Sequence, residues 1–242
     1  MFTCWKADSK LLPMSHPAPD PHSHPELDAD ARALLARAYG LRTQADSQAL
    51  YRDWATTYDQ TMLDGLQYQS PTLVAQMVAQ ALPHSAARAQ AAVLDVGCGT
   101  GLAGEALAVL GFAVVDGLDI SPEMMAVAMA RGAYLQCLRA DLLTTLPLAD
   151  AAYDAAVCCG TFTTGHVGAG CLDEIFRALR PGAPFAFTVK TSEWERLGFQ
   201  AALQRLQAAG MVQADSISPG RLYANSPEPD GMFCLVRRRA AA

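Results

Sequence analysis

Two aspartates and a run of glycines stand at points where apolar segments of the chain end. Residues 93–96 are apolar except for Asp95, and residues 97–101 (Gly-Cys-Gly-Thr-Gly) follow directly. Glycines at a turn from a strand into a helix let a ligand approach the backbone closely. In open α/β sheets, ligands bind at the carboxyl ends of the strands. The pattern therefore predicts a binding site at residues 95–101.

Asp119 ends the next apolar segment, about twenty residues after the glycines, which is the separation expected of an acid that binds a ribose. Its carboxylate could accept hydrogen bonds from both ribose hydroxyls. Asp141 follows the third segment and could accept a hydrogen bond from the exocyclic amine of an adenine. The apolar neighbours that could enclose the ring are Ile120, Met124 and Leu142.

Two cofactors that contain adenosine suit these residues. Gly99, Gly101 and Gly104 fit the GxGxxG pattern of NAD(P)-dependent oxidoreductases, but an anionic pyrophosphate at this loop would be opposed by Asp95. S-adenosylmethionine carries a sulfonium and an ammonium instead, and Asp95 would attract both cations. The charge of Asp95 therefore favours S-adenosylmethionine, and NAD(P) remains the alternative.

The elements that must position these residues alternate between short apolar runs and helical patterns. We expect a doubly wound, Rossmann-like, seven-stranded sheet that is mainly parallel. No helical segment separates the last two strands, so they must form a terminal antiparallel pair. The expected strands cover 93–97, 113–119, 135–139, 153–159, 183–190, 212–218 and 231–237, and the expected helices cover 101–110, 122–131, 170–179 and 193–209.

Three regions follow from composition. Residues 1–27 hold five of the fourteen prolines and three of the five histidines, which predicts a flexible tail. Residues 28–90 are expected to form a helical lid, with one helix over 47–62 that places Trp54 and Tyr58 on the same face. Residues 91–242 form the expected cofactor-binding domain.

Composition also limits the classes of function. The formal net charge is −6, so the chain lacks the basic surface that nucleic-acid binding requires. The seven cysteines include no CxxC pair, and we expect a cytoplasmic protein with reduced thiols and no bound metal. No apolar run approaches the length of a membrane span.

The motifs taken together resemble those of class I S-adenosylmethionine-dependent methyltransferases. VLDVGCGTG is similar to their first motif, GLDIS to their ribose-binding strand end, and RADLL to their adenine-contacting turn. YDAAVCCGTF and LRPGAPFAFTV resemble their fourth and fifth strands. The likeness covers about residues 50–236 and implies methyl transfer from S-adenosylmethionine.

A closer resemblance, to the Williams–Beuren-region methyltransferase-like group, rests on the aromatic pattern Tyr51-xx-Trp54-Ala55-xx-Tyr58-Asp59 with GTGLAGEAL, DISPEMMAVA and GAY. In that group an N-terminal aromatic helix folds over the cofactor. The resemblance implies that Trp54 or Tyr58 lines the pocket. The candidate cofactor residues are thus Trp54, Tyr58, Asp95, Gly97, Cys98, Gly99, Gly101, Asp119, Ile120, Met124, Asp141, Leu142 and Cys159.

The acceptor side is less defined. Cys159 ends the fourth strand, where the transferred methyl should lie, and we interpret Cys98 as a small filler rather than a nucleophile. His166 is the candidate general base, with a structural role as the alternative. Lys190 and Tyr223 lie near the mouth by topology and are interpreted as structural.

The segment CCGTFTTG replaces the acid-or-Asn, Pro-Pro, aromatic element of enzymes that methylate amino groups of nucleic acids or glutamine. We therefore expect a small-molecule acceptor, with a protein acceptor possible and nucleic acid disfavoured. A protein that binds the cofactor without catalysis is a further alternative. The oligomeric state is not predicted.

Overall fold

A computed structural model describes residues 33–240, apart from 35, 39, 41–43, 56, 83 and 164–166. The expected tail at residues 1–27 and the candidate base His166 lie outside the described residues.

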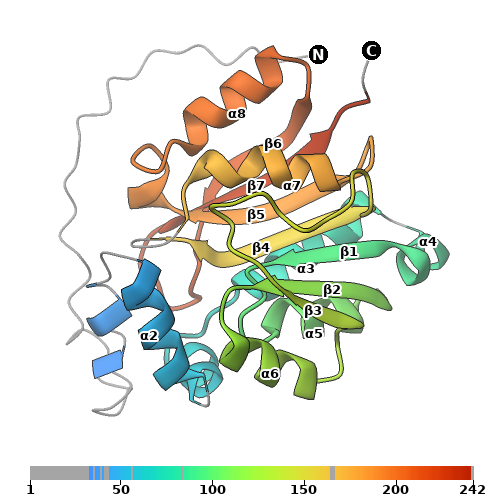
Figure 1. The fold of residues 1–242 in the computed structure, drawn as a ribbon. Coiled ribbons are helices and arrows are strands. Elements are labelled where there is room, and N and C mark those ends of the chain that lie inside the picture. Colours follow the sequence, from blue (N-terminus) through green and yellow to red (C-terminus); the bar gives the residue numbers. More distant parts are fainter. Residues whose placement is uncertain are drawn as a thin grey trace.

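One seven-stranded sheet forms the centre of the described chain (Figure 1), in the order β3-β2-β1-β4-β5-β7-β6. The first five strands pair in parallel, and β7 runs antiparallel to both β5 and β6. This confirms the predicted fold class and the antiparallel terminal pair. The strands are β1 (Ala92–Val96), β2 (Val114–Asp119), β3 (Gln136–Arg139), β4 (Ala155–Phe162), β5 (Pro184–Lys190), β6 (Val212–Gly220) and β7 (Gly231–Arg238).

Helices cover both faces of the sheet because the central strands are apolar on both sides. On β1, Val93 packs into the core beneath one helical layer, and Leu94 packs into the core on the opposite face. The first layer holds α3 (Ser70–Ala81), α5 (Leu102–Val109) and α6 (Pro122–Ala130), and the second holds α7 (Leu172–Ala178) and α8 (Phe199–Ala208). The short helix α4 (Ser85–Gln90) precedes β1 and was not expected.

Two predicted elements in the sheet domain have other bounds in the structure. Strand β4 continues past the expected end at 159 to Phe162, with an irregularity in its pairing between Cys158 and Phe162, where Gly160 has a φ of +75°. The expected helix over 193–209 begins only at Phe199, because Gly198 takes a φ of +77° and separates α8 from the short 3-10 turn Thr191–Glu193.

The expected helix over 47–62 is two elements. Helix α2 (Gln44–Trp54) stops at Trp54, and a π-helical turn follows at Gln60–Gly65. The side chain of Thr61 donates a hydrogen bond to the carbonyl of Thr57, 3.1 Å away, and accepts one from the Trp54 indole. Threonine side chains that bond to the backbone in this way compete with regular helix geometry.

This N-terminal segment packs against the β6–β7 hairpin, far away in the sequence. Leu50, Trp54 and Leu66 share a small apolar core with Leu222 and Phe233. The backbone of Gln69 donates to the Leu222 carbonyl at 3.0 Å. Helix α2 and the π-helical turn are therefore held over the carboxyl ends of the strands.

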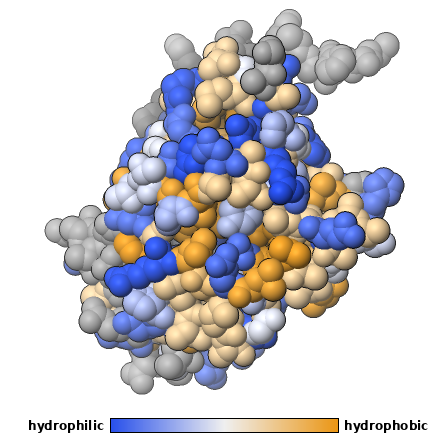
Figure 2. Space-filling view, turned by 45° about the vertical axis from the view of Figure 1, so that its right-hand side comes forward, coloured by the Kyte–Doolittle hydropathy of each residue, from blue (hydrophilic) through white to orange (hydrophobic). Residues whose placement is uncertain are grey.

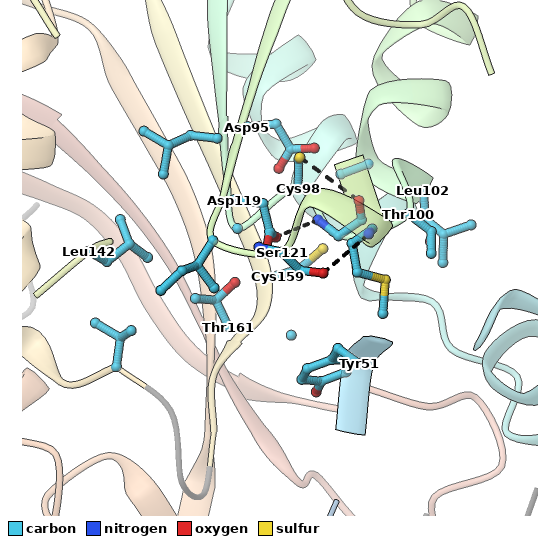
Figure 3. Close-up of a pocket in the computed structure, with 18 of the residues that line it drawn as sticks. Tyr51, Asp95, Cys98, Thr100, Leu102, Asp119, Ser121, Leu142, Cys159 and Thr161 are labelled. Atoms are coloured by element: carbon cyan, nitrogen blue, oxygen red, sulfur yellow. Dashed lines mark hydrogen bonds between the residues drawn. The ribbon is translucent and has the colours of Figure 1, made fainter. Parts of the chain in front are cut away.

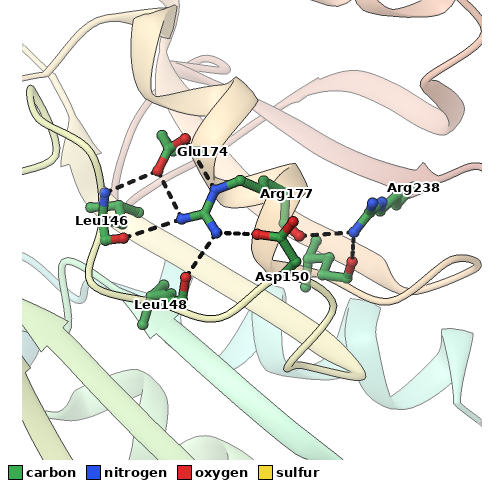
Figure 4. Close-up of polar contacts among 7 residues, drawn as sticks. Leu146, Leu148, Asp150, Glu174, Arg177 and Arg238 are labelled. Atoms are coloured by element: carbon green, nitrogen blue, oxygen red, sulfur yellow. Dashed lines mark hydrogen bonds and ion pairs between the residues drawn. The ribbon is translucent and has the colours of Figure 1, made fainter.

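The loop between β3 and β4 is fixed by one arginine of α7 (Figure 4). Arg177 donates to the carbonyls of Leu146 and Leu148 at 3.1 and 2.8 Å and pairs with Glu174 and Asp150. This cluster holds the far end of the loop that begins with Asp141.

The face drawn in Figure 2 alternates hydrophilic and hydrophobic residues. Large apolar side chains that are exposed come from separate elements: Leu63, Val109, Met129, Leu135, Leu143 and Met211. Among helices in the described part of the chain, none has the length and apolar character needed to span a bilayer.

Candidate active site

The glycine turn after β1 has the backbone conformation that the sequence predicts. Gly97, Gly99 and Gly101 have φ values of +70°, +52° and +96°, a region that residues with a Cβ rarely adopt. A Cβ on Gly97 would overlap the hydroxyl of Thr161 on β4, whereas one on Gly99 would meet nothing within 4 Å. The backbone at Gly99 therefore faces open space in which a ligand can lie directly against it.

Asp119 at the end of β2 is held rigidly over this turn (Figure 3). Its Oδ2 accepts a hydrogen bond from the Gly99 amide at 2.9 Å, and its Oδ1 accepts one from the Ser121 amide at 2.9 Å. Burial raises its pKa, and the backbone amides lower it. The carboxylate can accept further hydrogen bonds, as ribose hydroxyls would require.

Asp95 is the most deeply buried acid at the turn, with 1% of its surface exposed. Its Oδ2 accepts a hydrogen bond of 2.6 Å from the hydroxyl of Tyr134. Burial raises the pKa of Asp95 to about 7, against the lowering effect of Tyr134. A cationic ligand beside this carboxyl would favour its ionised form.

A cavity of about 530 Å³ opens above these residues at the carboxyl ends of the strands. It has the size of a typical small-ligand site. All thirteen expected cofactor residues line it except Gly101 and Trp54. Gly101 instead packs against Arg131 and Tyr134, and Trp54 lies behind Tyr58, with ring centroids 5.0 Å apart. Oδ1 of Asp141 accepts a hydrogen bond from the Leu143 amide at 2.9 Å, and its Oδ2 has no donor among the residues that the structure describes.

Several residues at the cavity were not among the candidate cofactor residues predicted from the sequence. Tyr51 and Tyr68 line it, and Thr100 donates a 2.6 Å hydrogen bond to Asp59 of the N-terminal segment. Arg131 pairs with the other oxygen of Asp59 and donates to the Thr100 carbonyl at 2.5 Å. Tyr51 stands three residues before Trp54 and seven before Tyr58, the spacing of one face of the expected helix, so this spacing was an available signal. The Asp59–Arg131 pair joins residues far apart and has no local signal.

The two cysteines at the cavity both have raised pKa values, so we expect them to keep their protons. Burial raises the pKa of Cys159 well above its ordinary value, and for Cys98 the hydrogen bond that its thiol donates to Cys137, together with burial, has the same effect. A thiol must ionise to act as a nucleophile. These directions agree with the interpretation of Cys98 as a filler and give Cys159 a contact role.

The site thus combines a glycine turn open to a ligand, a carboxylate positioned for a ribose and a buried acid suited to a cation. These groups fit S-adenosylmethionine. Asp95, Asp119 and Asp141 would hold its charged and polar groups, and the bound cofactor would supply an activated methyl group.

Comparison with known proteins decides the family. Residues 94–187 match the model of a methyltransferase domain. Human methyltransferase-like protein 27 is 34% identical over 189 residues, which cover 75% of this chain and 74% of that protein. The chain belongs to the class I S-adenosylmethionine-dependent methyltransferases. It is therefore an enzyme of this class rather than the NAD(P)-dependent oxidoreductase that the glycines alone left open.

Other similarities to this methyltransferase are shorter or more distant. The yeast 18S rRNA (guanine(1575)-N(7))-methyltransferase is 42% identical over 65 residues, 27% of this chain and 24% of that protein. A TehB-like S-adenosylmethionine-dependent methyltransferase from Corynebacterium glutamicum has a TM-score of 0.58 at 19% identity, covering 79% of this chain and 99% of that one. The [4+2]-cyclase SpnF has a TM-score of 0.53 at 18% identity, covering 70% and 82%. Both structures share the fold.

Proposed function

We propose that this methyltransferase binds S-adenosylmethionine in the main cavity and transfers its methyl group to a small molecule. Asp119 accepts the ribose hydroxyls, and Asp141 accepts the adenine amine with Ile120, Met124 and Leu142 around the ring. Asp95 faces the cationic methionine end, which places the methyl near Cys159. His166 remains a candidate base, and its position lies outside the described residues.

The observation that carries the small-molecule proposal is the aromatic cover at the methyl end of the cavity. Tyr51, Tyr58 and Tyr68 line this end together with Cys159 and Gly160. Tyr68 is buried, and Tyr58 is half-buried with its ring packed against Tyr51 and Trp54, so a bulky macromolecular group would have to displace packed side chains. In this proposal α2 and the π-helical turn act as the lid expected for residues 28–90.

RNA is the alternative acceptor, because one relative is named as an rRNA methyltransferase. The formal net charge of −6 opposes this alternative, since phosphate binding depends on lysine and arginine. The described cysteines are all free thiols, which supports a cytoplasmic location.

Two measurements test the proposal: calorimetry tests cofactor binding, and a methyl-transfer assay then tests the acceptor. We expect the full chain to bind S-adenosylmethionine and S-adenosylhomocysteine but not NADH, and Asp119→Ala to weaken binding by about 1–3 kcal/mol. With labelled S-adenosylmethionine, label should enter the small-metabolite fraction of a cell extract. Label found only in protein or RNA would contradict the small-molecule acceptor and identify the other class as the acceptor. Binding of S-adenosylmethionine without any methyl transfer would favour a non-catalytic protein.

A further inference from the structure

Two cysteines, Cys98 and Cys137, lie side by side next to the glycine turn. Cys98 belongs to the turn and lines the main cavity, and Cys137 lies on β3, the edge strand of the sheet. Their thiols share a hydrogen bond, which Cys98 donates. Both side chains pack into the apolar core on the face of the sheet that α3 and α5 cover. The two sulfurs are therefore held together by packing as well as by the hydrogen bond.

Gly117 on β2 makes this close approach possible. Its Cα pairs with that of Cys137 in the neighbouring strand, and the backbone amide of Cys98 donates to the carbonyl of Leu118 at 3.0 Å. A Cβ on Gly117 would stand 2.8 Å from the sulfur of Cys98 and 2.9 Å from the sulfur of Cys137, closer than real Cβ atoms come to a heavy atom. The missing side chain thus leaves one shared space for both sulfurs.

The two thiols differ in a way that suits a reacting pair. The hydrogen bond from Cys98 lowers the pKa of Cys137, against burial and the carboxylates of Asp95 and Asp119, which raise it. The same hydrogen bond and burial raise the pKa of Cys98. Cys137 is only partly buried, whereas Cys98 is buried. An accessible thiol with a lowered pKa beside a second thiol is typical of cysteines that sense oxidants.

We propose that Cys137 and Cys98 are a site of reversible oxidation, at which a hydroperoxide closes a disulfide that weakens the binding of S-adenosylmethionine. With hydrogen peroxide, the Cys137 thiolate attacks one oxygen, the oxygen–oxygen bond breaks, and a sulfenic acid and one water result. The sulfur of Cys98 then bonds to that of Cys137, the sulfur–oxygen bond breaks, and the oxygen leaves with the Cys98 proton as a second water. The two thiols lose two electrons, and the peroxide gains them. Cys98 has no part in methyl transfer under this proposal.

The disulfide would act on the cofactor site through the glycine turn. A disulfide holds its sulfurs about 2.05 Å apart, closer than two hydrogen-bonded thiols, so Cys98 must move toward β3. The next residue, Gly99, donates its amide to Asp119 at 2.9 Å and so orients the acid proposed to hold the ribose. Figure 3 shows Cys98 on this turn beside Asp95 and Asp119. This effect on affinity rests on the proposed function, which places the cofactor over the turn.

Treatment of the full chain with hydrogen peroxide tests the site directly. After the peroxide is removed and free thiols are blocked, trypsin cleavage at Arg131 places the two cysteines on separate peptides. Mass spectrometry without reduction should find these peptides joined through Cys98 and Cys137. Calorimetry on the same sample should show at least about fivefold weaker binding of S-adenosylhomocysteine, the lower end of usual coupling between sites. Dithiothreitol should restore the affinity.

Two variants separate this pair from the other thiols. Cys137→Ser should bind S-adenosylhomocysteine as the reduced wild type does, and peroxide should then neither join the peptides nor weaken binding. Cys171→Ser is the matched control, because Cys171 is buried on the opposite face of the sheet and serine can keep its bond to the Gly168 carbonyl. This variant should form the disulfide and lose affinity as the wild type does.

The possible outcomes distinguish the site, its effect and the proposed function. Peptides that stay separate in the oxidised wild type would overturn the disulfide site. A disulfide with unchanged affinity would overturn its effect on the cofactor, as would an equal loss of affinity in Cys137→Ser, which would point to another oxidised group such as Met124 in the cavity. If the reduced chain itself fails to bind S-adenosylhomocysteine, the proposed function fails instead, and the joined peptides still decide whether the disulfide forms.

Discussion

Tyr134 donates a 2.6 Å hydrogen bond to Oδ2 of Asp95 and accepts one of 3.1 Å from the amide of Gly104. The phenol therefore links the first turn of α5 to the acid at the end of β1. Burial raises the pKa of Asp95 to about 7, Tyr134 lowers it and Asp119 raises it. The ionisation of Asp95 consequently changes within the physiological range.

We predict that the affinity for S-adenosylmethionine falls as the pH falls below about 7. The protonated form of Asp95 loses its attraction for a cation, so affinity should drop by up to about tenfold per pH unit below the pKa. Calorimetry between pH 5.5 and 8.5 measures this effect. Asp95→Asn should bind weakly at every pH, and an equally steep profile in that variant would exclude Asp95 as the titrating group.

The raised pKa of Asp95 also predicts how the stability of the free enzyme depends on pH, and the direction is opposite to that of the cofactor affinity. The pKa of Asp95 is raised from 3.8 to about 7 on folding, so the folded state holds more protons between these values. The free energy of unfolding should therefore fall as the pH rises through this window, by at most about 1.4 kcal/mol per unit. The difference in urea unfolding between wild type and Asp95→Asn isolates the contribution from that of Asp119.

Tyr134→Phe should separate the two roles of the phenol. It leaves the Gly104 amide and Asp95 without a partner, which should destabilise the fold by about 1–3 kcal/mol. The pKa of Asp95 should rise further, because the hydrogen bond that lowers it is lost. The midpoint of the pH profile of cofactor affinity should then move upward. A destabilised variant with an unmoved midpoint would contradict the coupling.

The strand-end acids were predictable from the sequence because their positions follow from local patterns. Asp95 and Asp119 close apolar runs, and the glycine turn between them has a fixed spacing. Tyr134 and Asp59 were not predictable in this way. The bond from Tyr134 to Asp95 spans 39 residues and that from Arg131 to Asp59 spans 72, so both depend on packing between elements. Helix α2 ends early for a similar reason: Trp54 bonds to Thr61 in a turn that periodicity does not reveal.

Gly104→Ala should test how closely Tyr134 packs on α5. Alanine normally stabilises a helix interior relative to glycine by about 1 kcal/mol. Here its Cβ would lie 2.5 Å from the Tyr134 hydroxyl and overlap the ring, so we expect a loss of about 1–3 kcal/mol instead. Gly170→Ala is the control, because nothing lies within 4 Å of its Cβ position and its φ is not positive. Thermal melting of the two variants should show opposite or unequal shifts.

Asp59 should connect the N-terminal segment to cofactor binding. It accepts from Thr100 in the glycine turn at 2.6 Å and pairs with Arg131. Asp59→Ala should weaken S-adenosylmethionine binding by roughly 1 kcal/mol and speed proteolysis of the N-terminal segment. Asp53→Ala, which breaks only the exposed pair with Arg37, should change neither. Equal behaviour of the two variants would mean that the segment is held by its apolar core alone.

Arg177 should contribute more to stability than an ordinary surface arginine. Its guanidinium donates to the carbonyls of Leu146 and Leu148 and to Glu174, in a fork that lysine cannot reproduce (Figure 4). We expect Arg177→Lys to lower the free energy of unfolding by about 1–2 kcal/mol. Arg205→Lys, at the exposed pair with Asp173, should cost under about 1 kcal/mol. Because the loop that Arg177 holds begins with Asp141, Arg177→Lys should also loosen the adenine end of the cavity. Faster amide exchange at residues 141–148, with unchanged exchange in β1, is the signature that distinguishes local release of this loop from general destabilisation.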